Sequence, residues 1–505
     1  MTARPQIVAA LLSALLLFMA FRPLRLFPCA WIALIPVLRA AQGQPSRERF
    51  RLGALFGFVA FTAMFYWIPV TIFNGRWLIP LGVAPGVLLA LLAWTATGAV
   101  FALGCGLILT VGLTDLPPTS FTPLRLACVW FVWEWLRTQG ALGFEGGTLA
   151  LSQRPWLTLV QNVDLIGLHG VSWIIALTNA SLAFAPVTKR SLAIALALVA
   201  LGWLRGRWWK PTLEIVGTSK VALIQPFIPS REKVSAKRFP VNLPMLKELT
   251  ARAAGTGSEL VLWPETMIPR SWTLSPEIRS ELQQLVSQLD TEVLIGTNER
   301  ETKEGPLFNQ AVLLAPDGER GRVRKRRLVI FGEYVPLKRY LPFLRWLSPG
   351  NNDYHPGSVS APLNSRGGRF GVLVCFESTF SAEAKRLARA GAEFLVVVTN
   401  DDWFRGTTAI ADHTDWAVLR ALETRRWIVQ AANTGESVFI DPHGHIVRRL
   451  PLDQRAVLAH RVERLTTLTP AVRFGPVFPW LGVMVTFWLI GHGARPRSDC
   501  DGLAS

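Results

Sequence analysis

Charged residues are scarce in this 505-residue sequence: they make up 17% of it, whereas hydrophobic residues make up 50%. This balance excludes a single ordinary soluble domain. The apolar surplus fills residues 5–210 and returns at 477–491, while residues 211–470 have the mixed composition of a globular domain. We therefore predict a helical membrane domain over 1–210, a water-soluble domain over 211–470, and a last membrane helix with a short tail over 471–505.

Acidic residues are also few, 35 against 53 lysines and arginines, which gives a formal net charge of +18. Such an excess invites a nucleic-acid-binding interpretation. The arginines, however, lie largely at the ends of apolar runs and form no basic stripe with interleaved aromatic side chains. Arginines in that position orient membrane helices and meet anionic lipid headgroups. The charge pattern therefore argues against a nucleic-acid partner.

Only five cysteines are present, and Cys375 alone lies far from both an apolar, membrane-length segment and the chain end. Outside the cytoplasm it would have no partner in the soluble domain with which to form a disulfide. A lone cysteine is more often a buried small hydrophobe than a nucleophile. Cys375 ends the apolar run Val372–Val374, and Glu377 follows two residues later. Its surroundings must decide between the two roles.

Metal-ligating side chains at a usable spacing are lacking as well. His443 and His445 lie at the turn Asp441–Gly444, and no further ligands lie near them at a suitable spacing. We predict exposed turn residues there. The sequence predicts no metal site and no cofactor.

A signal-peptide cleavage site is missing after the apolar segment Ile7–Phe21, so we predict a retained helix there. Further apolar runs give seven predicted crossings before the soluble domain and an eighth after it. The other runs are Leu26–Leu38, Leu52–Thr71, Leu78–Val111, Phe121–Leu136, Leu165–Pro186, Leu192–Leu204 and Phe478–Ile490. The long run 78–111 is counted once, although it has the length for two helices.

Basic residues in the connections predict the orientation. With the amino terminus inside, the arginines of Arg39–Arg51, the pair Lys189–Arg190 and the tail residues Arg495 and Arg497 all face the cytoplasm. Seven crossings then place residues 211–470 outside. In a Gram-negative bacterium, this is the periplasmic side of the inner membrane.

Glu134 and Arg137 lie within a predicted span, three residues apart on one helix face. Charges at membrane depth are costly and are usually paired or functional. Two interpretations stay open: an ion pair that only holds the helix, and part of a substrate site.

The soluble domain alternates short β-rich runs with helical patterns, which predicts a layered α/β domain with a buried sheet. The predicted strands are Val221–Ile224, Leu260–Trp263, Glu292–Gly296, Ala311–Leu314, Gly371–Val374, Phe394–Val398, Ile428–Ala431 and Ser437–Ile440. The predicted helices are Leu243–Ala254, Pro276–Asp290, Ala382–Ala390 and Thr414–Thr424. Turn residues at Pro316–Gly318 and Asp441–Gly444 predict hairpin tips.

Three polar residues follow predicted strands, where α/β enzymes place their sites: Glu265, Lys325 and Cys375. Thiol acyl chemistry needs a nucleophile, a base that takes its proton, and a cation or amide donors for the developing oxyanion. These three side chains supply that set. Each alone also has a plainer interpretation as a loop carboxylate, a solvated charge or a core residue, and no histidine lies near enough in the sequence to be favoured as the base.

The motifs around these residues resemble the Glu–Lys–Cys framework of the carbon–nitrogen hydrolase (nitrilase) superfamily. They are Trp263–Glu265, Lys325–Pro336 and Cys375–Glu377, and the similarity continues through Asn400–Phe404 and the helix end Leu419–Glu423. Together with the predicted membrane spans, the chain resembles the apolipoprotein N-acyltransferase family over nearly its whole length. The resemblance implies a nitrilase-like αββα sandwich outside the cytoplasm, joined to a multi-pass helical membrane domain.

The resemblance also implies roles for single residues. Glu265 would be the general base that deprotonates the nucleophile Cys375, and Lys325 would hold the oxyanion of the tetrahedral intermediate. Glu333 and Glu377 match acidic positions that could fix Lys325 and organise proton transfer. With one ammonium and several carboxylates clustered around a thiol, perturbed pKa values are expected.

Asn309 and Trp403 match further family positions around the pocket. The sequence departs from the family pattern at three places. Phe376 follows the nucleophile where many relatives carry Tyr, Ile330 replaces a common Pro, and the segment Ser230–Ser235 lacks the Trp that is frequent there. These changes concern the lid and the acceptor rather than the catalytic three.

The family implies a two-step transfer in which Cys375 takes an acyl chain from a membrane phospholipid, often phosphatidylethanolamine. The amine of a diacylglyceryl-cysteine at a lipoprotein's amino terminus then receives it. Two alternatives stay open: a membrane-tethered amidase, in which water resolves the thioester, and a catalytically inactive lipoprotein-binding scaffold. The loops 338–365 and 401–412 are candidate lids that admit acyl chains. Their apolar residues, whose removal should weaken lipid use, include Phe343, Leu344, Trp346 and Leu347.

Overall fold

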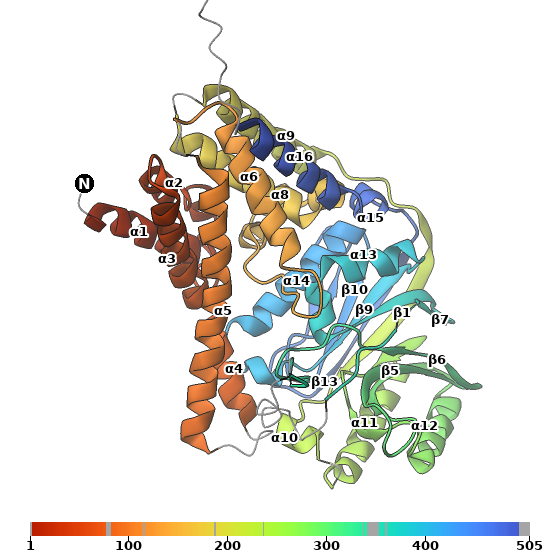
Figure 1. Ribbon diagram of the computed structural model, residues 1–505. Helices are drawn as coiled ribbons and strands as arrows, with labels where there is room; N and C mark the ends of the chain where they lie inside the picture. Colours follow the sequence, from red (N-terminus) through yellow and green to blue (C-terminus); the bar gives the residue numbers. More distant parts are fainter. Residues whose placement is uncertain are drawn as a thin grey trace, which may run out of the picture.

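The computed structural model consists of a helical region and a sheet-containing domain that lie side by side, with the long helix α5 (Val83–Gly112) running along both (Figure 1). It describes residues 3–76, 82–114, 117–185, 188–235, 237–336, 338–340, 353–358 and 361–493. The apolar lid residues predicted at 343–347 lie outside these ranges.

The helical region is built from apolar segments of unequal length. Its helices are α1 (Ala3–Ala20), α2 (Ile35–Ala41), α3 (Ser46–Met64), α4 (Trp67–Gly75), α5, α6 (Thr122–Leu136), α7 (Leu157–Val160), α8 (Val163–Ala183) and α9 (Lys189–Trp208), with α15 (Pro470–Phe474) and α16 (Phe478–Gly493) after the sheet domain. The segment around 78–111 is one helix of 30 residues, as counted from the sequence.

Length and composition single out only part of the eight predicted spans among the described residues. Among the described residues, α5, α8 and α9 are long and apolar enough, and α3 with α4 makes a fourth if this pair, bent by 50°, counts as one span. The predicted span Leu26–Leu38 is wrong as a continuous helix. It divides into a 3-10 turn, η1 (Phe27–Trp31), and the short α2, each with a proline in its first turn, where proline begins a helix rather than continuing one.

The sheet domain contains every strand predicted from the sequence and five more. One sheet has the order β13 (Ala456–Leu465), β1 (Ile215–Gln225), β2 (Leu260–Leu262), β4 (Glu292–Glu299), β5 (Phe308–Ala315) and β6 (Gly318–Arg324), with β3 (Ile268–Ser271) beside β4. The other has the order β12 (Ile446–Arg449), β11 (Val438–Ile440), β10 (Ile428–Ala432), β9 (Phe394–Thr399), β8 (Gly368–Val374) and β7 (Leu363–Ser365). The predicted turns join β5 to β6 and β11 to β12.

The two sheets pack face to face, with helices on both outer faces. Side chains such as Leu223 of the first sheet and Val372 of the second share one apolar core. Leu246 from α11 (Phe239–Ala254) and Leu282 from α12 (Pro276–Leu289) cover the first sheet. The helices α13 (Ser381–Arg389) and α14 (Ala409–Thr424) cover the second. This is the predicted αββα order of layers.

The outer face of α13 and α14 is continuous with the helical region, since residues of both belong to one apolar core cluster. A buried ion network strengthens this junction. Arg420 of α14 contacts Glu145 of the loop after α6 at 3.0 Å and Glu423 of its own helix at 3.0 Å. Ser381 donates its backbone N–H to Glu145. The catalytic layer and the helical region therefore form one packed unit.

We expect Arg420→Met to destabilise the protein by about 3–5 kcal/mol, because Glu145 and Glu423 would stay buried without their shared counterion. Denaturant titration of the full chain in detergent measures this effect. The matched control Arg449→Met removes a half-exposed partner of Glu436 and should cost less than about 1 kcal/mol. Equal losses of unfolding free energy for the two substitutions would contradict the role of Arg420 as a buried ion-pair partner that joins the two parts of the protein.

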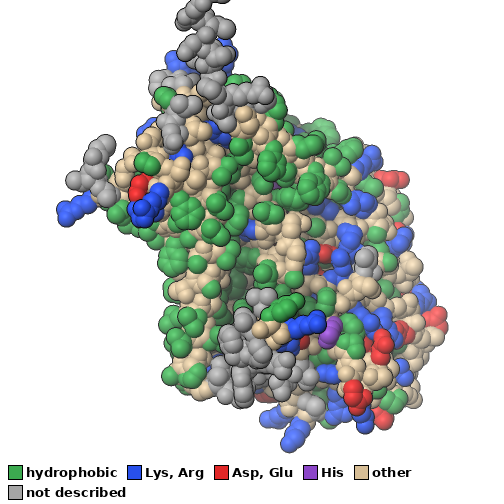
Figure 2. Space-filling model, in the orientation of Figure 1, with side chains coloured by type: hydrophobic (Ala, Val, Ile, Leu, Met, Phe, Trp, Pro, Cys, Tyr) green, Lys and Arg blue, Asp and Glu red, His purple; other side chains and the backbone are tan. Residues whose placement is uncertain are grey.

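The surface divides in the same way as the composition. Figure 2 shows hydrophobic side chains gathered over the helical region and charged ones over the sheet domain. The exposed apolar residues on α5 and α16 include Leu88, Leu92, Leu103, Trp480 and Phe487. A contiguous apolar surface of this kind requires a lipid or protein covering.

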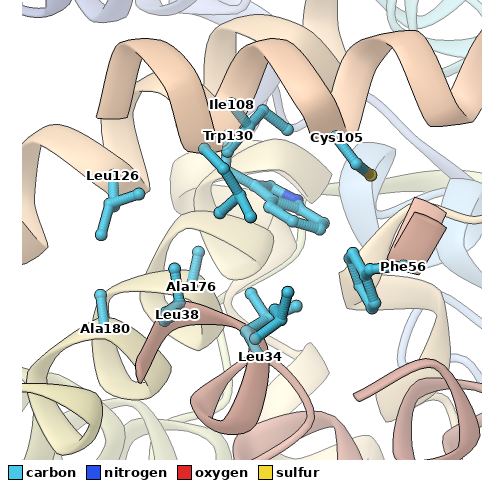
Figure 3. A pocket seen from close by; sticks show the side chains of 11 residues that line it. Leu34, Leu38, Phe56, Cys105, Ile108, Leu126, Trp130, Ala176 and Ala180 are labelled. Carbon is cyan, nitrogen blue, oxygen red and sulfur yellow. The ribbon is translucent and has the colours of Figure 1, made fainter. Parts of the chain in front are cut away.

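A small cavity inside the helical region is lined by apolar side chains and has a volume of about 20 Å³ (Figure 3). Leu34, Phe56, Ile108 and Trp130 lie around it. This volume is that of about one water molecule, and the lining offers no polar partners, so the cavity is a packing gap rather than a ligand site.

Glu134 and Arg137, predicted to lie within a span, each form hydrogen bonds with other residues. Glu134 accepts hydrogen bonds from the Trp130 indole and the Leu149 backbone, both at 2.9 Å. Arg137 donates to the carbonyls of Phe144 and Gly146. Both side chains thus help to hold the loop that follows α6.

Candidate active site

Cys375 stands at a sharp turn at the end of the buried strand β8. Its φ angle is +51°, in the left-handed region, and the chain turns there directly into the 3-10 helix η6 (Cys375–Thr379). Non-glycine residues with this φ are uncommon, and where they occur the surrounding structure has to hold them. The thiol is buried and is hydrogen-bonded by Thr399 of the neighbouring strand β9.

The fold brings four other predicted residues into one hydrogen-bonded cluster. The Lys325 Nζ donates to Glu265 Oε1 at 3.0 Å and to Glu333 Oε1 at 2.9 Å. The Asn309 side-chain amide donates to the same two oxygens at 2.8 and 3.0 Å. Glu265, Lys325 and Asn309 are buried. Glu265 follows β2, Lys325 follows β6, and Asn309 lies on β5, so three strands of one sheet assemble the cluster.

Close backbone contact fixes the position of Glu265. A Cβ on Gly296 of β4 would lie 2.2 Å from the Pro264 oxygen and 2.8 Å from the Glu265 Cα. Thr266, the next residue, has a φ of +51°. The loop after β2 therefore lies directly against a glycine, which directs Glu265 toward Lys325.

Electrostatics couples this cluster to the thiol. Burial, reinforced by the Glu265 charge, raises the pKa of Cys375 far above its ordinary value, although Lys325 opposes the shift. Burial would also raise the pKa of Glu265, but Lys325 and Lys233 hold it below its usual range. Glu265 and Glu333 overcome the effect of burial and raise the pKa of Lys325. At neutral pH the site holds a thiol, a carboxylate and an ammonium.

Glu377 lies beneath the turn rather than in the charged cluster. Its carboxylate accepts hydrogen bonds from the backbone N–H groups of Val374 at 2.8 Å, Arg326 at 2.7 Å and Arg327 at 3.2 Å. Burial raises its pKa, against these hydrogen bonds. Glu377 thereby ties the loop that carries Lys325 to the turn that carries Cys375.

Trp403, the remaining predicted residue, is not part of the cluster. It lies on the 3-10 helix η7 (Asp401–Phe404), where its carbonyl accepts a hydrogen bond from Asn74 of α4 at 3.2 Å. Phe404 packs edge-on against Trp67 of α4 with ring centroids 5.5 Å apart. These contacts anchor the predicted lid segment 401–412 to the helical region, which disfavours a freely moving lid.

A histidine that sequence distance had discounted lies directly under the nucleophile. The Nε2 of His413, on α14, is 3.2 Å from the Cys375 carbonyl oxygen and 2.7 Å from Ser378 Oγ. Its Nδ1 is 2.8 Å from Asp401 Oδ1, and Asp401 raises the pKa of His413 although burial opposes this. The ring touches the backbone of Cys375 and supports the turn.

We expect His413→Ala to lower the acylation rate of Cys375 about tenfold or more, because a lost buried hydrogen bond costs about 1–3 kcal/mol and the turn loosens. Single-turnover kinetics on the purified chain, with the unfolding midpoint measured in parallel, checks this. His445→Ala, on an exposed turn, is the control. An unchanged rate for His413→Ala would show that the turn holds without it.

A cavity of about 1220 Å³ opens beside the cluster. Residues adjacent to the cluster line it, including Phe376, Tyr334 and Tyr354, together with Gly140 and Ala141 of the helical region. The Phe376 ring stacks on Phe144 at 6.4 Å and meets Phe380 edge-on at 5.0 Å. Phe376, whose missing hydroxyl was noted in the sequence, therefore serves as an apolar wall between the two parts of the molecule.

Comparison with known proteins identifies the family of the chain. The carbon-nitrogen hydrolase family profile matches residues 220–469, and the profile of the apolipoprotein N-acyltransferase N-terminal domain matches residues 13–181. The apolipoprotein N-acyltransferase of Geobacter metallireducens is 33% identical over 496 residues, covering 94% of this chain and 93% of the relative. The chain belongs to the apolipoprotein N-acyltransferase family. The family member of Coxiella burnetii is 29% identical, with 96% and 99% covered.

Solved structures resemble the sheet domain more remotely. The Caenorhabditis elegans NitFhit protein has 16% sequence identity and a TM-score of 0.40, covering 56% of this chain and 66% of its own. A carbon-nitrogen hydrolase from Helicobacter pylori has 16% identity and a TM-score of 0.38, covering 48% and 89%. Membership of the family, predicted from the sequence motifs, rests on the relatives above and is confirmed.

Proposed function

We propose that the chain transfers an acyl group from a membrane phospholipid to the amino-terminal amine of a diacylglyceryl-cysteine lipoprotein, through a thioester on Cys375. The observation that carries the proposal is the buried thiol beside the Glu265–Lys325 pair, next to a large cavity bordered by both the helical region and the sheet domain. Family membership supports the same reaction.

In the first half-reaction, Glu265 accepts the thiol proton while the Cys375 sulfur attacks the sn-1 ester carbonyl. Lys325 then stabilises the tetrahedral oxyanion, because its ammonium is fixed in a buried site. Collapse of the intermediate breaks the carbon–oxygen bond. The lysophospholipid leaves with the proton returned by Glu265, and the acyl group stays on sulfur.

In the second half-reaction, the lipoprotein amine attacks the thioester carbonyl and gives a proton to Glu265. The carbon–sulfur bond breaks, an amide forms, and Cys375 regains its proton. Through both steps, hydrogen bonds to Glu333 and Asn309 hold the side chains of Lys325 and Glu265 in position. Glu377 holds the two catalytic loops together.

The remaining predictions complete the proposal. Residues 1–210 and the last helix after 471 would embed the protein in the bacterial inner membrane, and the catalytic domain 211–470 would face the periplasm. Phosphatidylethanolamine would be the donor. Anchoring enzyme, donor and acceptor in one leaflet raises their effective concentrations without further contacts.

The test is a transfer assay with the purified full chain, phosphatidylethanolamine labelled in its sn-1 chain, and a synthetic diacylated lipopeptide with a free amine. We expect a triacylated peptide and lysophospholipid in equal amounts. The same peptide with an acetylated amine is the control and should receive no label. Free labelled fatty acid in place of the triacylated peptide would identify a hydrolase, and no consumption of the donor would indicate an inactive scaffold.

A further inference from the structure

Lys233 is a second lysine buried at the active site. It ends the short helix α10 (Ser230–Lys233), in the segment noted in the sequence only for its missing Trp, and is 4% exposed. Its Nζ donates a hydrogen bond to the backbone oxygen of Glu265 at 3.0 Å. The loop after β1 thereby places an amine against the backbone of the residue whose carboxylate is the proposed base.

Side chains at the start of η7 and directly after β10 hold this helix in place. Asp402 Oδ2 accepts the Ser230 backbone N–H at 2.8 Å, and the Asn400 amide donates to Ser230 Oγ at 3.2 Å. Asn433 hydrogen-bonds both the N–H and the carbonyl of Ile228. The segment 400–402, Asn433 and the Glu265 carbonyl together fix the position of Lys233.

The charges around the thiol make a second cation useful. Glu265 and Glu333 carry two negative charges against the single positive charge of Lys325. A thiolate formed by proton transfer to Glu265 would leave Glu333 and the sulfur as the two anions of the site. Four groups face Lys233: Glu265, Cys375 and Asp402, which favour its charged form, and Lys325, which disfavours it.

We propose that Lys233 is a positioning residue whose ammonium balances the charge of the site and stabilises the Cys375 thiolate as the acyl enzyme forms. The inference rests on the proposed use of Cys375 as a nucleophile. The alternative is a purely structural amine that holds the Glu265 carbonyl. A neutral donor would serve that purpose equally well, whereas charge balance requires a cation.

The charge of Lys233 depends on pH near neutrality. Burial lowers the pKa of Lys233 to about 8, although Glu265 opposes the shift. The ammonium is therefore present below pH 8 and lost above it. We therefore expect the ammonium to stabilise the Cys375 thiolate below pH 8 and to lose this effect above it.

The test measures alkylation of Cys375 by iodoacetamide between pH 6 and 10, read by peptide mass spectrometry on the full-length protein. The partly exposed Cys29 in the same digest reports the intrinsic reactivity of the reagent. The variants are Lys233→Arg, which keeps the charge, Lys233→Gln, which keeps a donor, and Lys233→Met, which keeps neither. No lipid or peptide substrate is used, so a failure of this inference is distinguishable from a failure of the proposed function.

At pH 7 we expect Lys233→Gln and Lys233→Met to react about ten- to a hundredfold more slowly than the native chain, a shift of one to two pKa units in the thiol. Lys233→Arg should stay within about threefold, given the similar charge. Above pH 8 the alkylation rates of the native chain and the neutral variants should converge. The plot of rate against pH should change slope near pH 8 for the native chain but not for Lys233→Arg. The proposal would be overturned if Lys233→Gln reacted as fast as the native chain. It would also be overturned if the neutral variants reacted more slowly by the same factor at every pH. The native and Arg profiles alone decide it if the neutral variants do not fold.

Discussion

Replacement of Cys375 by alanine is expected to abolish acyl transfer, lowering the rate by about 10⁴- to 10⁶-fold, since the proposed route carries the acyl chain as a thioester on this sulfur. Cys375 is the only thiol at the site in the described part of the chain, because the other cysteines described there, Cys29, Cys105 and Cys128, belong to the helical region. The transfer assay with labelled phospholipid measures the loss.

Cys29→Ser is the matched control for this substitution, because it also removes one sulfur from a free cysteine. Its activity should equal that of the native chain. The unfolding midpoint of Cys375→Ala should stay close to native, because alanine fits a small buried site. Substantial transfer by a folded Cys375→Ala would rule out the thioester route.

Glu265→Gln is expected to slow acylation of Cys375 by about 10²- to 10⁴-fold, the usual contribution of a positioned general base. Glutamine has the same shape and can accept the hydrogen bonds from Lys325 and Asn309, but it cannot take the thiol proton. Lys325 keeps its other partner, Glu333, at 2.9 Å, so the cluster should stay folded. Single-turnover acylation by phospholipid isolates the affected step.

The control for the base is Glu281→Gln, a carboxylate on α12 that pairs with Lys247 at 2.7 Å far from the thiol. We expect native rates for this variant. Because Glu265 has a lowered pKa and Cys375 a raised one, native acylation should also fall as the pH drops through the pKa of Glu265, below its ordinary range. A Glu265→Gln variant that acylates at the native rate would remove Glu265 from the mechanism.

Secondary structure was predictable where strands are buried on both faces. Leu260–Leu262 and Phe394–Thr399 are continuous apolar runs and were identified directly. Four of the strands that were missed, β6, β7, β12 and β13, lie at the edges of the two sheets. Edge strands are paired on one side only and carry polar residues, as in Gly318–Arg324, so no apolar run marks them.

The membrane segments were predictable in composition but not in length. Apolar runs locate α5, α8 and α9 well, since long helices need only hydrophobicity and few breaks. Prolines and a bend after Met64 shorten or divide other segments, and their effect depends on tertiary packing. Hydropathy therefore locates these apolar segments but does not show where a helix within them is divided or bent.

Residues of the candidate site could be predicted only where they belong to a recognisable sequence motif. Glu265, Lys325 and Cys375 were identified through the family resemblance. In the structure Glu265 and Lys325 form an ion pair, and the Cys375 thiol feels the charges of both. Lys233 and His413 were missed. Lys233 is one of several lysines in a polar segment, and His413 lies 38 residues from Cys375 in the chain. Only the packing of α10 and α14 against the sheets reveals their contact with the site.

The resting protonation states explain why the site needs more than a base. The pKa of the Cys375 thiol is raised and that of Glu265 is lowered, so proton transfer between these two groups alone is unfavourable. Substrate carbonyl, Lys325 and the proposed charge of Lys233 would each stabilise the negative charge as the carbon–sulfur bond forms. We therefore expect acylation of the thiol to be fastest when the bound ester and these charges together stabilise the transition state.

The most direct test of the account is the mass of Cys375 after the purified protein meets phospholipid without a lipoprotein acceptor. We expect peptide mass spectrometry to find one acyl chain on Cys375, absent from Cys375→Ser as a thioester. A diacylated lipopeptide with a free amine should discharge the adduct, and the same peptide with an acetylated amine should not. An active enzyme that forms its triacylated product while Cys375 is never acylated would contradict the central claim.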